Sequence, residues 1–563
     1  MKRILAWICL LTMILLVGGC SRQPENNTET VMTTQAPSTE PTEPPHQWQL
    51  GYLAAMQPEV SYYDAEGAQL GTLPRGAQVA YELTPEGKLT LLLQEEIVWL
   101  REGTFAVSDP AAVVPEHTLY VRTAVNLRDI EGKLLPAFAQ KGAAVEVTGC
   151  DYVSEGQVHM YRVTLEGTEG YIMPHYLTDT KEAALANYDD GHYATHASRT
   201  DRFGGGGAAD LDYFPREKEP IEGNVMPEEC RTLYITSWQV SNADAYLRVA
   251  QDSGINAFVV DIVDGVAVGY AADVMKAYCP SAAAKALNTV EEYQAGIQKL
   301  KDAGYYVIGR ITTFNDSFFI QDHPEYAITD PEGKPLRLSG EYWPTAYNRT
   351  AWQYKVDLAV EAVELMGFHE IQFDYVRFPD LTYSYEQAGT IDFHNTYGET
   401  KAQAIQRFLM YATDIIHEHG AYVSADVYGE SAFTYVTAYG QYWPAISNVV
   451  DAISGMPYLD HFEAVGEWLP WKNPYDTLYS WGSSVKSRQA ETATPAAVRT
   501  WIQAYNAIKE PYNVIGANEV AAQIRALRDT GCTGGFMTWN SAGSLDKYAQ
   551  LKPAFAPPEE KQE

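Results

Sequence analysis

Residues Glu370-Ile371-Gln372-Phe373-Asp374-Tyr375-Val376-Arg377-Phe378-Pro379 have the alternating pattern of a buried β-strand that ends in polar side chains. Successive side chains of a strand point to opposite faces, so Gln372 and Asp374 share one face and the apolar residues share the other. The apolar face is suited to packing against helices. Asp374 is then predicted to point toward the open end of the sheet. Arg377 lies just beyond it, where it could pair with a carboxylate or position a substrate.

The C-terminal half of the chain repeats this strand-like texture, and amphipathic stretches lie between most of the apolar segments. Strands are expected at 233–238, 257–262, 305–312, 370–375, 422–428, 450–456, 498–503 and 535–539. The clearest amphipathic helices are expected at 352–366, 402–419 and 519–530. About eight strand–helix units predict an α/β fold, a (β/α)8 barrel of the TIM type at residues 231–553. A doubly wound open sheet is the alternative, but the sequence has no glycine fingerprint after its first strand.

Carboxylates at the ends of two neighbouring strands point to a two-carboxylate reaction centre. Asp426 and Tyr428 share a face of the strand that follows Asp374 in the sequence, and Glu430 comes next in the loop. Neighbouring strands lie about 4.8 Å apart, and the two carboxyl groups of retaining glycosidases lie about 5–5.5 Å apart. The candidate catalytic residues are therefore Asp374, Asp426 and Glu430. A partner at Glu430 would lie further from Asp374 than Asp426 does. One carboxylate must stay ionised, and the other must give a proton to the leaving oxygen.

Polar and aromatic residues near the other strand ends are the candidate substrate-binding groups, because barrel enzymes build their active sites at the carboxyl ends of the strands. Aromatic rings can stack on the apolar faces of sugars, and Arg, Gln and Asn can bind hydroxyl groups. For any single Trp or Tyr, an ordinary place in the core is the alternative. The candidates are Asp261, Arg310, Arg377, Tyr428, Tyr458, Trp501, Gln503, Trp539 and Asn540.

The barrel sequence resembles a family of glycoside-hydrolase-type barrel domains marked by Phe-Asp-Tyr-Val-Arg-Phe-Pro. The matching segments are 309–311, 323–325, 367–379, 423–429, 453–458 and 535–540, in the family's order. The resemblance implies a barrel fold and glycosidase chemistry, and a distant likeness to the alpha-amylase clan supports Asp374 as the nucleophile. The sequence departs from the family at Val263, where relatives usually carry Lys, and at Pro457, within the family's Met-Val-Tyr-Pro pattern.

The N-terminus has the features of a lipoprotein signal. Lys2 and Arg3 precede a short apolar run, and Gly18-Gly19-Cys20 closes the segment, which predicts a signal peptide at 1–19 and a lipidated Cys20. An ordinary cleaved signal with an incidental cysteine is the alternative. Residues 20–47 are rich in Pro, Thr, Glu and Asn and predict a disordered tether. The protein is thus expected on the extracytoplasmic face of the cell membrane, held there by its lipid.

Two small all-β modules are expected between the tether and the barrel, at 48–110 and 118–179. Asn126-Leu127-Arg128, Lys141-Gly142 and Gly170-Tyr171-Ile172 occur in the order typical of bacterial SH3 repeats, which 118–179 resembles; 48–110 resembles a degenerate copy. The resemblance implies binding of wall peptides or glycans, with a spacer lacking any ligand as the alternative. Residues 180–230 are read as a linker and 554–563 as a tail.

Composition and missing motifs narrow the remaining function classes. A net charge of −33 argues against nucleic acid as a partner. The cysteines show no CxxC pattern, the 12 histidines form no HExxH, and no G-x-S-x-G elbow occurs, so neither a metal-dependent nor a serine hydrolase is favoured. No cofactor is expected. The sequence predicts a glycoside hydrolase acting on envelope polysaccharide or peptidoglycan. A catalytically silent carbohydrate- or wall-binding lipoprotein is the alternative.

Overall fold

The computed structural model describes residues 46–85, 87–188, 196 and 198–556. The expected signal peptide, Cys20, nearly all of the expected tether and most of the C-terminal tail lie outside these residues. The described residues from Leu50 onward belong to one compact unit. None of the helices within the described ranges combines the length and the hydropathy needed to cross a membrane.

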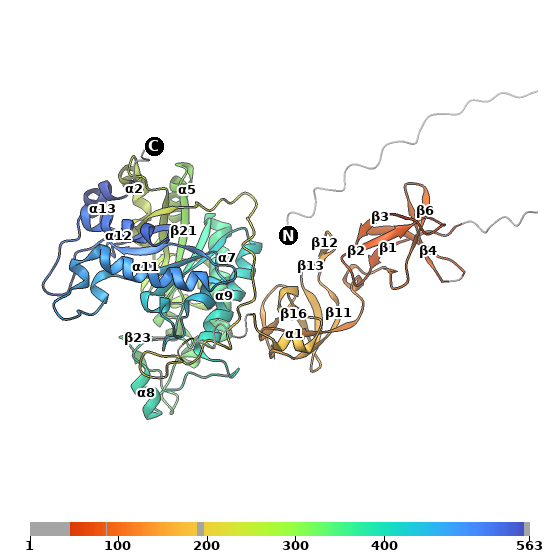
Figure 1. The fold of residues 1–563 in the computed structure, drawn as a ribbon, viewed down its shortest axis with the longest axis horizontal. Helices are drawn as coiled ribbons and strands as arrows, with labels where there is room; N and C mark the ends of the chain where they lie inside the picture. Colours follow the sequence, from red (N-terminus) through yellow and green to blue (C-terminus); the bar gives the residue numbers. More distant parts are fainter. Residues whose placement is uncertain (1–45, 86, 189–195, 197, 557–563) are drawn as a thin grey trace, which may run out of the picture. The chain divides into compact units, whose positions relative to one another are not determined.

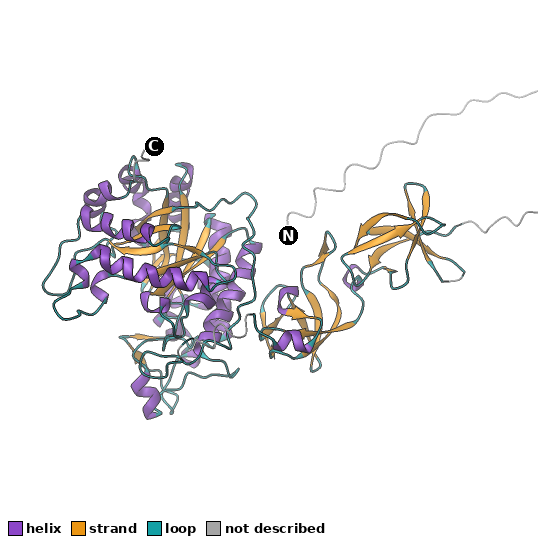
Figure 2. Cartoon of the chain, viewed as in Figure 1, coloured by secondary structure: helices purple, strands orange, loops and turns teal. Residues whose placement is uncertain are grey.

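Two seven-stranded antiparallel sheets form the N-terminal β modules (Figures 1 and 2). The first contains β1 (Gln49–Ala54), β2 (Glu59–Tyr63), β3 (Gln69–Pro74), β4 (Gln78–Leu83), β5 (Leu89–Leu93), β6 (Glu96–Leu100) and β7 (Phe105–Val107). The second contains β8 (His117–Val121), β9 (Val125–Arg128), β10 (Leu134–Ala139), β11 (Ala144–Cys150), β14 (Tyr161–Leu165), β15 (Thr168–Ile172) and β16 (Leu177–Thr178). The short hairpin β12 (Val153–Ser154) and β13 (Gln157–Val158) interrupts the second module.

The two modules have the same strand order. The first runs β3-β2-β6-β5-β4-β1-β7 and the second β10-β9-β15-β14-β11-β8-β16, which match position by position once the extra hairpin is set aside. The two consecutive segments therefore have the same sheet topology.

The C-terminal part is built around a nearly closed parallel sheet with helices on its outside (Figure 2). Its strands are β17 (Cys230–Ile235), β18 (Ala257–Asp264), β21 (Tyr306–Thr312), β24 (Glu370–Asp374), β25 (Tyr422–Tyr428), β26 (Ala452–Met456), β27 (Ala497–Val498), β28 (Thr500–Gln503) and β29 (Gly535–Trp539). They follow the order β27-β26-β25-β24-β21-β18-β17-β29-β28, and β27 and β28 are separated only by Arg499. Counted as one interrupted strand, these two give the eight strands that the sequence predicts.

A helix follows each barrel strand (Figure 1). The helices in chain order are α2 (Ala243–Ala250), α5 (Val290–Asp302), α7 (Arg349–Met366), α9 (Lys401–Glu418), α10 (Trp443–Ser447), α11 (Pro474–Ala490), α12 (Ala517–Asp529) and α13 (Leu545–Leu551). Local sequence sets their ends. Thr400 and Gln403 form a capping box at the start of α9, and Gly367 ends α7 in the left-handed conformation with φ of 69°.

Two expected strand boundaries are wrong. The first barrel strand is Cys230–Ile235 instead of 233–238, because Ser237–Asn242 turns into a 3-10 helix and leaves Trp238 56% exposed. The seventh strand is broken at Arg499, where the chain changes partner from β26 to β29. In both places the apolar character of the segment was visible, but the point at which it leaves the sheet depends on neighbouring strands.

The alternation within β24 is as the sequence predicts. Phe373 lies against Phe408 of α9, with ring centroids 5.2 Å apart, whereas Gln372 is buried inside the barrel and donates to Ser454 Oγ. The described part of the connector from 198 to 230 packs on the barrel through several hydrogen bonds, among them Asn224 Nδ2 to the carbonyls of His369 and Gly420. The four cysteines among the described residues (Cys150, Cys230, Cys279 and Cys532) are buried and unpaired as disulfides.

Candidate functional site

One guanidinium group gathers four carboxylates at the carboxyl ends of the barrel strands. Arg310 Nη1 lies 2.7 Å from Asp261 Oδ1 and 3.3 Å from Asp264 Oδ1. Its Nη2 donates to Asp374 Oδ2, and its Nε lies 3.5 Å from Asp426 Oδ2. We call these five residues the mouth cluster. It joins the ends of β18, β21, β24 and β25, four consecutive strands of the sheet.

Strand register explains why these residues meet. Asp261 pairs with Arg310 across β18 and β21. Phe373 pairs with Ala425 across β24 and β25, so the next residue of each strand, Asp374 and Asp426, stands at the same height. A period of two then turns both side chains toward the barrel axis. The structure thus brings together the two aspartates that the sequence places at neighbouring strand ends.

The two aspartates have different electrostatic surroundings. Asp374 accepts from Arg310 and also from the backbone N–H of Tyr375, at 2.6 Å. Burial and then the nearby charge of Asp374 raise the pKa of Asp426 well above its ordinary value. Asp426 Oδ1 accepts from Trp501 Nε1 at 2.7 Å. Asp426 is therefore suited to hold a proton.

Asp261 is the second carboxyl group of the cluster whose pKa is raised. Burial raises the pKa of Asp261 to about 7 despite the opposing charge of Arg310, and the charge of Asp264 contributes in the same direction. The Tyr234 hydroxyl also donates to Asp261. One guanidinium does not offset three buried carboxylates and the partly exposed Asp264, so the pKa values of Asp261 and Asp426 rise.

Glu430 and Arg377 lie outside the mouth cluster, in a second group beside it. Glu430 accepts from the hydroxyls of Tyr435, at 2.8 Å, and Tyr439, at 3.0 Å. Arg377 donates to the Tyr428 hydroxyl at 2.5 Å, and Tyr428 packs edge-on against Tyr439. The two predicted residues are thus linked through tyrosines.

An aromatic wall borders the mouth cluster. The ring of Trp539 lies 5.0 Å from Tyr234, 5.6 Å from Trp501 and 6.2 Å from Tyr458, and the Arg310 guanidinium lies 5.5 Å from its centroid. Three of the four predicted aromatics, Tyr458, Trp501 and Trp539, therefore lie together beside the predicted acids, and the fourth, Tyr428, lies with Arg377. An aromatic ring in such a wall can bind the apolar face of a sugar when one face of the aromatic ring is exposed.

Two predicted residues are placed differently. Gln503 is fully buried, and its side chain accepts from the backbone of Asp460 and donates to the carbonyl of Tyr505, so it holds a loop. Asn540 is 6% exposed, and its Nδ2 has no hydrogen-bond partner among the described residues.

Sequence reasoning missed Asp264 and Tyr234. Asp264 was visible as a second acid at the end of the Asp261 strand, and its side chain is 35% exposed. Tyr234 lies in an apolar strand. Only the direction of its hydroxyl, which points to Asp261 in the folded chain, distinguishes it from an ordinary core residue. The conformation of Tyr375 was also unforeseen: its φ of 49° is uncommon for a non-glycine residue, and it turns the chain directly after Asp374. Among the described residues, no group of three or more His, Cys, Asp or Glu side chains is arranged to hold a metal ion.

Comparisons with known proteins complete the description of this domain. Residues 232–545 match the model of a family described as "Putative glycosyl hydrolase domain". No curated protein matches the chain.

Solved structures with detectable similarity include a hypothetical protein from Ruminiclostridium thermocellum ATCC 27405, which is 33% identical over 35% of this chain and 97% of its own, with a TM-score of 0.29. Flavobacterium johnsoniae chitobiase is 12% identical over 59% of this chain and 49% of its own, with a TM-score of 0.40. The Bacillus cereus spore cortex-lytic enzyme SleL is 10% identical over 59% of this chain and 75% of its own, with a TM-score of 0.33.

The family model spans more than half of the 563 residues and contains every member of the mouth cluster, and the chain belongs to this glycosyl hydrolase domain family.

Proposed function

We propose that the protein is a lipid-anchored glycoside hydrolase that cleaves a polysaccharide or peptidoglycan strand of the cell envelope. The observation that carries this proposal is the meeting of Asp374 and Asp426 on the Arg310 guanidinium at one height of the barrel. Family membership supports the reaction class, and the mouth cluster supports the residues.

In this proposal Asp374 is the nucleophile and Asp426 the general acid. Arg310 and the backbone N–H of Tyr375 donate to Asp374 and orient it, and the raised pKa of Asp426 keeps its proton available. Asp374 attacks the anomeric carbon while the glycosidic bond breaks and Asp426 protonates the departing oxygen. Asp426, now ionised, then takes a proton from a water molecule, which displaces Asp374 from the sugar.

The proposal predicts retention of the anomeric configuration. Two carboxylates that contact one guanidinium from adjacent strands are compatible with the separation of about 5–5.5 Å found in retaining enzymes. Glu430 is engaged by Tyr435 and Tyr439 away from Asp374, so we assign the acid to Asp426. Trp539 and Tyr458 supply rings for the sugar, and Arg377 lies where it could bind a hydroxyl group.

A second candidate is a glycan-binding lipoprotein without catalysis, and one observation favours it. The side chains of Asp374 and Asp426 are only 6% and 0% exposed, so a substrate reaches them only if the loops at the mouth move. In this candidate, Asp374 and Asp426 would bind the hydroxyl groups of a sugar without cleaving its glycosidic bond.

Reducing-end release from a panel of peptidoglycan, exopolysaccharides and chito-oligosaccharides tests the proposal, with soluble protein that begins at Trp48. The matched variants are Asp374→Asn at the mouth and Glu370→Gln at the other end of the same strand. We expect release by the parent and by Glu370→Gln, and loss of release in Asp374→Asn. Release that survives in Asp374→Asn contradicts the nucleophile assignment. Binding without release by the parent supports the second candidate.

The lipid anchor at Cys20 is a separate part of the proposal and rests on the sequence of the first twenty residues. Metabolic labelling with a radioactive fatty acid should mark the full-length protein and leave Cys20→Ala unlabelled. Label that persists in Cys20→Ala would contradict the anchor.

A further inference from the structure

A groove of about 520 Å³ lies between the second β module and the barrel. We call it the side groove. Residues 133–136, at the start of β10, form one wall. The other wall comes from barrel loops that precede α7 and follow β24, together with the first turn of α7.

The lining of the side groove combines aromatic rings with small polar groups. Tyr278, Tyr326 and Tyr397 are half-buried there, and Thr350 and Asn348 lie between them. Rings that keep part of their surface open bind the apolar faces of sugars, and neighbouring hydroxyl and amide groups bind the sugar hydroxyls.

The charged residues of the side groove are largely balanced. The Arg349 guanidinium lies 4.3 Å from the centre of the Tyr397 ring and pairs with Glu399 at 2.7 Å. Lys133 lies 3.5 Å from Glu131, and Glu325 adds a carboxylate to the lining. A lining without a large excess of either charge suits an uncharged polymer with hydroxyl groups better than a polyanion or a polycation.

The side groove and the barrel mouth share a wall. Thr345 and Tyr347 line the groove, and the Tyr347 ring lies 4.7 Å from Phe378 of the Asp374 segment. In the same loop, Trp343 lies 6.0 Å from Tyr375 and 5.1 Å from the Arg377 guanidinium. One short loop therefore borders the groove on one side and the residues directly after Asp374 on the other.

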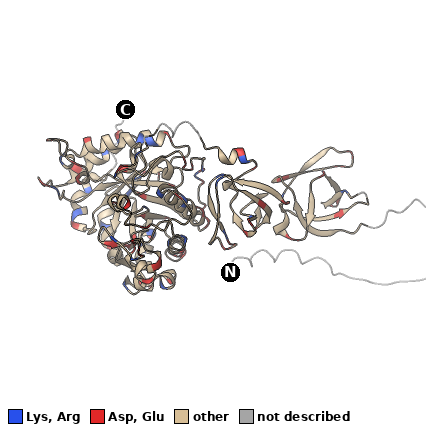
Figure 3. Cartoon of the chain, turned by 90° about the horizontal axis from the view of Figure 1, so that it is seen from below, with Lys and Arg blue, Asp and Glu red and all other residues tan. Residues whose placement is uncertain are grey.

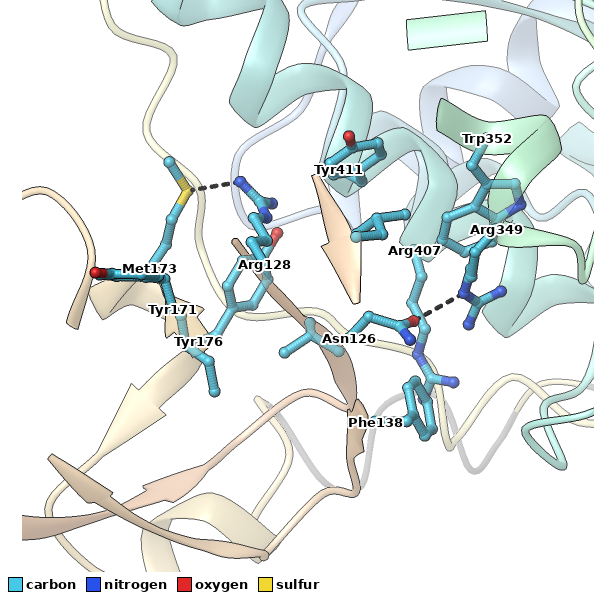
Figure 4. Close-up of a pocket in the computed structure, with 13 residues that line it drawn as sticks. Asn126, Arg128, Phe138, Tyr171, Met173, Tyr176, Arg349, Trp352, Arg407 and Tyr411 are labelled. Carbon is cyan, nitrogen blue, oxygen red and sulfur yellow. Dashed lines mark hydrogen bonds between the residues drawn. The ribbon is translucent and has the colours of Figure 1, made fainter. Parts of the chain in front are cut away.

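Buried contacts hold the second β module against the barrel, so β10 is a fixed wall. Arg128 Nη2 lies 2.6 Å from Asp414 Oδ2 of α9, and both side chains are 6% exposed. Tyr176 donates to the same carboxylate at 2.7 Å, and Arg349 donates to Asn126 at 2.8 Å. Figure 4 shows Arg128, Tyr176 and Asn126 facing Tyr411 and Arg349 of the barrel helices.

The acidity of Asp414 agrees with this docking. Burial alone would raise its pKa, but His175 and Arg128, both from the second module, hold the pKa of Asp414 well below its usual range. Because this buried carboxylate of α9 pairs with Arg128 of the module, separation of the module from the barrel would leave a buried charge without its partner.

We propose that the side groove is a secondary glycan-binding site, which holds a downstream stretch of the same polymer chain that the barrel mouth cleaves. This inference rests on the proposed function for the identity of the polymer. The second β module then contributes directly to substrate binding through β10, and the enzyme distinguishes long chains from short ones.

Binding of a length series tests the inference without requiring catalysis. The probes are chito-oligosaccharides from disaccharide to octasaccharide and solubilised peptidoglycan glycan strands, titrated by calorimetry into the Asp374→Asn protein. We expect affinity to rise with length, and Tyr397→Ala in the same background to weaken octasaccharide binding about tenfold while leaving the disaccharide unchanged. Leu135→Trp, which fills the groove from β10, should have the same effect.

Tyr512→Ala is the control, because Tyr512 is 66% exposed and does not line the groove. Equal binding, or no binding, of the octasaccharide and the disaccharide by the parent would overturn the inference, as would full octasaccharide affinity in both groove variants. Length-dependent binding that Tyr397→Ala removes, in a protein whose parent releases no reducing ends, would support the groove and refute the proposed hydrolase.

Discussion

The two ends of the barrel each contain a buried arginine paired with carboxylates, and they differ in charge balance. At the base, Arg499 Nη1 lies 2.5 Å from Glu370 Oε2, both side chains are 0% exposed, and the Tyr306 hydroxyl donates to the same oxygen at 3.0 Å. We call these three residues the base cluster. At the mouth, the single guanidinium of Arg310 faces four carboxylates.

This difference in charge balance shows that a buried ion pair by itself does not identify a reaction centre. In the base cluster one cation meets one anion, an arrangement that serves the fold. In the mouth cluster the excess of carboxylates raises the pKa of Asp426 and of Asp261, and groups with raised pKa values can exchange protons near neutral pH. Charge imbalance, and not burial, distinguishes the two ends. It is also local: over the barrel helices as a whole, Lys and Arg are interspersed with Asp and Glu (Figure 3).

The largest expected effect is on kcat, which should fall for a variant at the mouth and not for one at the base. Asp374→Asn should lower kcat about 10⁴-fold, because the nucleophile is lost while the side chain keeps its shape. Glu370→Gln, four residues earlier on the same strand, should leave kcat within about threefold. Steady-state kinetics of both variants on the cleaved polysaccharide is the measurement. Equal losses in the two variants would remove the functional distinction between the ends.

The next effect separates the ends by stability. Arg499→Met leaves Glu370 buried without its cation, so we expect the free energy of unfolding to fall by about 3–5 kcal/mol. The activity per folded molecule should stay unchanged. Chemical denaturation followed by far-UV circular dichroism, together with kinetics at low denaturant, checks both parts. An unchanged unfolding midpoint would show that the base cluster does not stabilise the barrel.

The pH dependence of catalysis tests the raised pKa of Asp426. A general acid works only while protonated, so kcat should hold as pH rises above the ordinary range of an aspartate and fall about tenfold per pH unit once the raised pKa is passed. Asp426→Asn should abolish this alkaline limb and retain activity on aryl glycosides, whose leaving groups need no proton. An alkaline limb that persists in Asp426→Asn would assign the acid to another group.

The smallest effect concerns Asp261. Its pKa is raised to about 7 in the folded protein against about 3.9 in an unfolded chain. The protonated form therefore stabilises the fold below about pH 4, and this contribution is lost as pH rises through about 7. Asp261→Asn, which keeps a neutral side chain, should raise the free energy of unfolding by about 1–3 kcal/mol at pH 8 and give no gain at pH 4. Denaturation of both proteins at the two pH values provides the comparison. A variant less stable than the parent at pH 8 would contradict the direction of the shift.

The sequence was most informative where side-chain direction follows from local periodicity. Alternation in 370–375 and 422–428 placed Asp374 and Asp426 on the inner face of neighbouring strands, and both lie in the mouth cluster. The sequence was least informative where a polar residue satisfies a distant backbone. Gln503 sits at a strand end like the others, but the loop that it holds through Asp460 exists only in the folded chain.

Residues within a few positions of one another set the alternation of strands and helices and the apolar stripes and caps of the helices. The family followed from several short segments that occur in a fixed order. Three features could not be predicted in this way: Arg310 joins four carboxylates, Glu430 accepts from two tyrosines, and β10 of the second module forms a wall of the side groove. Those outcomes depend on strand register and domain docking. The free energies that set them come from contacts between residues far apart in the chain, which no local pattern records.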